Sequence, residues 1–67
     1  MQEISYKKLF VLLQSRNISR TELIRMSGIS TNMMAKLGKN ESVHLSVLYK
    51  ICKTLNCNLE EIVEFKH

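Results

Sequence analysis

A short polar stretch, residues 31–36, carries side chains able to read the edges of DNA bases. An asparagine can make two hydrogen bonds to adenine, a lysine can donate to guanine, and small methyl groups can contact a thymine methyl. At about 100° per residue, Asn32, Ala35 and Lys36 share one face of a helix, and Thr31 and Met33 lie at its flanks. Met34 and Leu37 point the other way, toward a core. The base contacts that we expect are Thr31, Asn32, Met33, Ala35 and Lys36. Two alternatives stay open. Met33 could be a packing residue at the edge of the core, and the polar residues could be an ordinary solvated surface.

The stretch just before this helix is typical of a second helix that would hold it in place. Ser19 and Glu22 have the spacing of a capping box, in which the hydroxyl and the carboxylate each accept a backbone N–H of the first turn. Gly28 supplies the left-handed conformation that ends one helix and turns the chain. Ser30 can cap the next helix. Two short capped helices separated by a glycine turn are typical of a helix-turn-helix, whose second helix enters the DNA major groove.

Phosphate groups are the second expected partner of this region. The amino ends of both helices carry unpaired N–H groups and the positive end of the helix dipole, which suit phosphate oxygens. The phosphate contacts that we expect are Arg20, Thr21, Ser30, Lys39 and Asn40. If about four phosphates are neutralised per monomer, log K should fall with log salt with a slope near −3.6.

The charge of the chain is unevenly distributed. The net charge is +4 over 67 residues. Residues 1–40 contain seven Lys or Arg and two Glu, a balance of +5, whereas residues 55–67 contain one Lys and three Glu, a balance of −2. A basic half of this kind suits a face on a polyanion, although charge alone fits any soluble basic domain equally well.

Hydrophobic periodicity predicts an all-α protein, a compact bundle of five short helices in a single domain, residues 1–67. We expect the helices at residues 5–16, 20–27, 31–37, 45–55 and 59–65, with Asn17, Gly38 and Asn56 or Cys57 as stops. Leu45 begins an apolar face on the fourth helix, and Phe65 ends one on the fifth. Asn58 and Glu61 repeat the capping box. No segment alternates strongly enough to predict a strand.

Other classes of function have little support in the sequence. Cys52 and Cys57 are five residues apart, which on a helix places them on different faces, so we interpret Cys52 as a core residue and expect no metal site. Free thiols fit a cytoplasmic protein. No run of apolar residues is long enough for a membrane span or signal sequence. The absence of aspartate and of a nucleophile–base pair argues against an enzyme, and we expect no cofactor and no small-molecule ligand.

Taken together, the sequence resembles the Cro/C1-type helix-turn-helix family, also called XRE or phage-repressor-like. The matching stretches are ISRTEL, GISTNMMAKLGKN and LYKICKTLNCNLEEI. The resemblance implies the lambda-repressor-like fold of five helices and a transcriptional regulator, most often a repressor, that binds a palindromic operator as a homodimer. It also implies DNA contacts at Arg20, Ser30, Thr31, Asn32, Lys36, Lys39 and Asn40.

Three positions depart from the family pattern. Ile24 replaces a small residue at the closest approach of the two helices, and His44 replaces a Ser or Thr cap. Ser27 replaces an apolar residue, and we expect its hydroxyl to bond back to the backbone.

One other function stays open, that of a protein-interaction module such as an antitoxin or anti-repressor. The acidic carboxyl end and the apolar side chains Val47 and Tyr49 would serve it. Apolar surface left over at Val63 or Phe65 would serve self-association, and the alternative that both side chains complete the core stays open.

Overall fold

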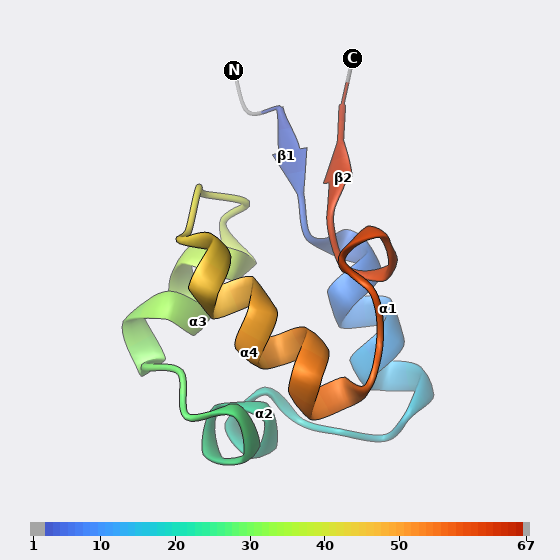
Figure 1. Ribbon diagram of the computed structural model, residues 1–67, viewed down its shortest axis with the longest axis vertical. Helices are drawn as coiled ribbons and strands as arrows, with labels where there is room; N and C mark the ends of the chain where they lie inside the picture. The colour runs from blue at the N-terminus through green and yellow to red at the C-terminus, as the bar shows by residue number, and fades with distance from the viewer. Residues whose placement is uncertain (1–2, 67) are drawn as a thin grey trace.

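The computed structural model describes residues 3–66, which form four α-helices, a 3-10 helix and a two-stranded antiparallel sheet. In chain order the elements are β1 (Ile4–Ser5), α1 (Lys7–Ser15), α2 (Arg20–Ser27), α3 (Thr31–Gly38), α4 (Leu45–Leu55), η1 (Leu59–Glu61) and β2 (Glu64–Phe65). In Figure 1, α4 runs through the centre, with α3 on one side, α1 on the other and α2 across its lower end. None of the described helices is long and apolar enough to cross a membrane. Residues 1, 2 and 67 of the expected domain lie outside the described residues.

The predicted caps of the two central helices are confirmed. The Ser19 hydroxyl accepts the Glu22 N–H at 3.1 Å, and the Glu22 carboxylate accepts the Ser19 N–H at 3.1 Å. Gly28 is left-handed, with φ of 78°, and ends α2. The Ser30 hydroxyl then accepts the Met33 N–H at 3.1 Å. These bonds satisfy N–H groups that have no partner inside the helices, so they define where α2 and α3 begin.

Asparagine ends three segments of the chain in the left-handed conformation. Asn17, Asn40 and Asn56 have φ of 59°, 59° and 54°. Asn17 and Asn56 are the predicted stops. The prediction that Gly38 ends the third helix needs correction, because Gly38 is the last residue inside α3 and the left-handed residue is Asn40.

Each of the four α-helices contributes to one apolar core. Its buried members are Tyr6, Leu9, Leu13, Leu23, Ile29, Met34, Leu37, Leu48, Ile51, Leu55 and Ile62. Ile29 lies in the turn between α2 and α3, so its burial fixes the corner of the helix-turn-helix to the core. Leu45 is a correction: it is 68% exposed, because α4 starts with its first turn beyond the edge of the core.

The predicted fifth helix, residues 59–65, is wrong, and so is the expectation of no strand. Only the 3-10 turn η1 forms, followed by β2, which pairs antiparallel with β1 so that Ile4 is opposite Phe65. Lys66 extends this pairing by donating its N–H to the Glu3 carbonyl at 2.7 Å. A seven-residue helix has little stability of its own, so tertiary pairing prevails over it. The same pairing moves the start of the first helix from Ser5 to Lys7.

Candidate nucleic-acid interface

The α3 helix has one face in the core and one face open. Met34 and Leu37 are 5% and 0% exposed, and they hold the helix against the rest of the protein. The side chains predicted to contact bases have a different environment: Thr31, Asn32, Ala35 and Lys36 are exposed, and Met33 is half-buried. The α3 helix therefore has the buried face and the exposed face that the sequence predicts, with a polar amide, a methyl and a cation on the exposed face.

The amino ends of α2 and α3 lie at exposed positions. Thr21 is exposed in the first turn of α2, and Ser30 is exposed at the start of α3. The Ser30 hydroxyl accepts the Met33 N–H, which leaves its own proton available to donate. Both ends therefore present donors next to the positive end of a helix dipole, the arrangement that suits phosphate oxygens.

Arg20 is placed by two residues that sequence reasoning did not assign to the site. Its guanidinium carbon lies 4.3 Å from the centroid of the Phe10 ring. A Cβ at Gly38 would lie 3.2 Å from the Arg20 Nη1 atom, so the missing side chain leaves room for the guanidinium at the end of α3. The sequence predicts Gly38 only as a helix stop. Phe10 follows the apolar spacing of α1, and this spacing gives no indication of a contact with an arginine.

The loop after α3 is anchored to the start of α1. The Asn40 side-chain oxygen accepts the Tyr6 N–H at 2.9 Å, and the Tyr6 hydroxyl donates to the Glu41 carbonyl at 2.8 Å. Asn40 therefore has its carboxamide oxygen occupied and only its NH₂ group left for a phosphate. Lys39, beside it, is exposed. Burial raises the pKa of the Tyr6 phenol, an effect opposed by a backbone hydrogen bond from Val43.

The three departures from the family pattern have separate outcomes. The Ser27 hydroxyl donates to the Leu23 carbonyl at 2.6 Å, which confirms the expected bond back to the backbone. Ile24 is half-buried against the core. His44 precedes α4 without a side-chain capping bond, and together with Met33 and Lys36 it lines a shallow hollow beside α3. His44 thus lies beside two of the residues predicted to contact bases, whereas the sequence placed it only at the cap position of a helix.

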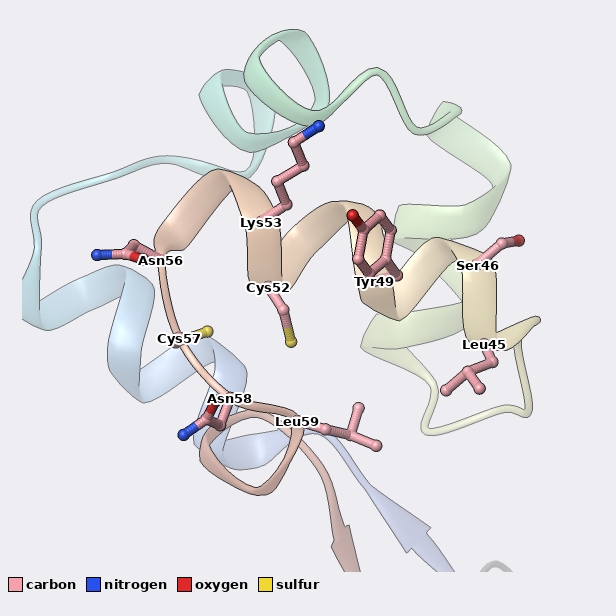
Figure 2. A pocket seen from close by; sticks show the side chains of 9 residues that line it. All are labelled: Leu45, Ser46, Tyr49, Cys52, Lys53, Asn56, Cys57, Asn58 and Leu59. Atoms are coloured by element: carbon pink, nitrogen blue, oxygen red, sulfur yellow. The ribbon is translucent and has the colours of Figure 1, made fainter.

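An apolar groove opens elsewhere, between α4 and η1 (Figure 2). Its lining residues are Leu45, Ser46, Tyr49, Cys52, Lys53, Asn56, Cys57, Asn58 and Leu59. Tyr49 and Leu59 are 64% and 43% exposed. Phe65, expected on an apolar helix face, is 66% exposed on β2. Of the apolar residues considered for a partner, Val47 and Val63 instead pack partly against the core.

The two cysteines are closer than helical spacing predicted. We expected different faces of one helix, but α4 ends at Leu55 and the chain reverses at Asn56, so both thiols line the same groove. Burial raises the pKa of the Cys52 thiol to about 11, with further contributions from Cys57 and Glu61. Within residues 3–66, no three His, Cys, Asp or Glu side chains gather in a way that could hold a metal ion.

Comparisons with known proteins also indicate a helix-turn-helix DNA-binding protein. Residues 8–67 match the family model described as the Cro/C1-type HTH DNA-binding domain. The chain is 38% identical over 58 residues to the uncharacterized HTH-type transcriptional regulator YozG of Bacillus subtilis (strain 168), covering 84% of this chain and 69% of YozG. It is also similar to the crystal structure of the transcriptional regulator VanUg, with a TM-score of 0.90 and 46% identity, covering 94% of this chain and 84% of the other. Both relatives are named as regulators and neither as an enzyme.

Proposed function

Because the chain belongs to the Cro/C1-type helix-turn-helix family of DNA-binding transcriptional regulators, we propose that it binds double-stranded DNA sequence-specifically, with α3 in the major groove. The observation that carries this proposal is the two-sided environment of α3. Two of its side chains are anchored in the core, and its opposite side exposes Asn32, Ala35 and Lys36. A helix held in this way can enter a groove without disturbing the fold.

In this arrangement Asn32 is placed to pair with adenine and Lys36 to donate to guanine. Thr31 and Ala35 supply methyl groups, and Met33 lies at the edge of the contact. These five residues specify the sequence of the operator.

A second set of residues positions the protein on the backbone of the DNA. It consists of Arg20, Thr21, Ser30, Lys39 and Asn40, which lie at helix amino ends or just after α3. Contacts of this kind hold the register of the helix and carry no sequence information themselves. The Phe10 ring under Arg20 restricts the guanidinium before DNA arrives, which lowers the entropy lost on binding.

We propose that the protein acts in the cytoplasm as a repressor and as a homodimer on a palindromic operator. Occupation of a promoter by such a dimer would exclude other proteins from the same grooves. The groove between α4 and η1 supports a second copy as the partner, because exposed apolar residues line it. Lys53 lies on its α4 side and Leu59 on its η1 side. A two-fold axis can pair such a pattern with itself. The relatives, named as regulators, favour this function over an antitoxin or anti-repressor.

The experiment is selection of bound duplexes from a random pool at two salt concentrations. The wild type should yield a palindrome with half-sites about 34 Å apart. Asn32→Ala and Lys36→Ala should each relax one position per half-site and lose about 1–3 kcal/mol of discrimination there. Lys7→Ala is the matched control, since it removes one exposed positive charge that lies beside the acidic residues of η1 and β2 and is not among the expected DNA contacts. Selection of no sequence, with all binding lost at moderate salt, would contradict the proposal.

A further inference from the structure

The two thiols at the end of α4 meet through a specific helix-ending geometry. The Cys57 N–H donates to the Cys52 carbonyl at 3.0 Å, and the intervening Asn56 is left-handed and also donates its N–H to that carbonyl. A bond spanning six residues over a left-handed residue brings the side chains of the first and last residues into contact. In most proteins that contact is between two apolar groups, whereas in this chain both are cysteines.

Both thiols are reachable from solvent. Each is a free, half-buried cysteine, and both line the groove between α4 and η1. Figure 2 shows the Cys52 side chain extending from α4 into the space beside the descending chain, and the Cys57 sulfur directed from that chain toward α4. The two side chains interact strongly enough for Cys57 to contribute to the raised pKa of Cys52.

We propose that Cys52 and Cys57 form an intramolecular disulfide when the protein meets a hydroperoxide. The Cys57 thiolate attacks the peroxide oxygen, breaking the O–O bond and leaving a sulfenic acid; with hydrogen peroxide the departing oxygen becomes water. The Cys52 sulfur then displaces the sulfenic oxygen, forms the S–S bond and gives up its proton, which releases a second water. Two thiols lose two electrons and two protons, and the peroxide gains them.

The order in which the two thiols react follows from their surroundings. Only the thiolate form attacks a peroxide or a disulfide. Burial holds the pKa of Cys52 at about 11, so at neutral pH this residue is almost wholly protonated and is a poor nucleophile toward peroxide, which leaves the first step to Cys57. Cys52 gives up its proton only in the second step, as it attacks the neighbouring sulfenic sulfur. The closed bond ties the last turn of α4 to the segment that leads into η1. It thereby joins two of the residues that line the groove.

The test combines intact mass, thiol counting and peptide mapping on the full chain treated with hydrogen peroxide. We expect a monomer that has lost two hydrogen atoms, has no alkylatable thiol, and contains a 52–57 crosslink removed by a reductant. Cys52→Ser and Cys57→Ser should each retain the fold and instead gain oxygen or form crosslinked dimers.

A second measurement tests whether the fold places the thiols. In glutathione redox buffers, the effective concentration of one thiol toward the other should be about tenfold or more higher in the native state than in urea. Equal values in the two states would overturn the proposal, since any chain with this spacing would then do the same. Wild-type protein that gains oxygen or crosslinks between chains, as the single-cysteine variants do, would overturn it too. Neither measurement involves DNA, so failure of the disulfide and failure of the proposed regulator are separate results.

Discussion

The Arg20 guanidinium lies over the ring of Phe10, 4.3 Å from its centroid, and joins the first helix of the protein to the amino end of the second. Its Nη1 atom also approaches Gly38 at the end of α3. One cation therefore touches three helices at the margin of the proposed DNA face. The position of the Arg20 guanidinium can be altered by substituting Phe10 or Gly38, without replacing the arginine itself.

Replacing the ring is the first way to test this contact. In Phe10→Leu the apolar volume is largely retained but the cation–π attraction, about 0.5–1 kcal/mol at exposed sites, is lost. We expect DNA affinity to fall severalfold and by the same factor for specific and non-specific duplexes, because a phosphate contact carries no sequence information. Fluorescence anisotropy on both duplexes would measure this. Val11→Ala, on an exposed part of the same helix, is the control. A change confined to the specific duplex would argue that Arg20 contacts bases.

Gly38→Ala tests the position of the same guanidinium by a change in α3. Alanine is favoured over glycine inside a helix by about 1 kcal/mol, so thermal unfolding should show an unchanged or higher Tm. The new Cβ would lie 3.2 Å from the Arg20 Nη1 atom and push the flexible end of the arginine away. We therefore expect equal or greater stability together with weaker DNA binding. Unchanged binding would mean that the position of Arg20 has no role in it.

Gly28→Ala is the matched comparison for that variant. A Cβ at Gly28 meets nothing within 4 Å, but the φ of 78° is strained for alanine. It should cost about 1–2 kcal/mol of unfolding free energy, measured by urea denaturation. Gly28→Asn should recover much of the loss, since asparagine tolerates the left-handed region. If alanine were tolerated as well as asparagine, the left-handed turn would not be what requires glycine.

The free energy of unfolding should decrease with rising pH in the alkaline range. The folded-state pKa of Cys52 is raised from 9.0 to about 11, and that of Tyr6 is raised as well. As pH rises past 9, the unfolded chain loses these protons first, which favours unfolding. The stability that the neutral groups contribute is complete below pH 9 and is lost as pH approaches 11. Urea denaturation across this range should show the decline, and Cys52→Ala and Tyr6→Phe should each make it shallower. Identical slopes in all three proteins would contradict the assignment.

The groove between α4 and η1 offers a test of the proposed homodimer. Leu45 and Tyr49 are 68% and 64% exposed, so Leu45→Glu and Tyr49→Ser should change the unfolding free energy by less than about 0.5 kcal/mol. Sedimentation should nevertheless show a shift toward monomer, and DNA binding should show a larger loss of affinity for a full palindrome than for a half-site. Val11→Ser, 55% exposed on α1, should leave association unchanged. Association that survives both groove substitutions would place the dimer contact on another surface.

Local chemistry determined the part of this protein that the sequence could predict. The bounds of α2 and α4 were predicted residue for residue, and those of α3 to within one residue. Ser19, Glu22, Gly28 and Ser30 act on backbone groups at most a few residues away, so their roles can be recognised without knowing the fold. The open and buried faces of α3 follow from helical periodicity in the same way. Whether its open residues contact DNA stays a prediction.

Only the tertiary structure decided how distant segments meet. Ile4 pairs with Phe65, and Tyr6 binds the loop at Asn40; each contact joins residues more than 30 positions apart, which no local pattern encodes. Arg20, at the start of α2, lies over Phe10 of α1. Such contacts form only when the loop that joins their partners is closed, and the energy that closes it comes from burying the whole core. The core is also why a segment with helical spacing became a turn and a strand: burying Ile62 and pairing the chain ends outweighed a short helix.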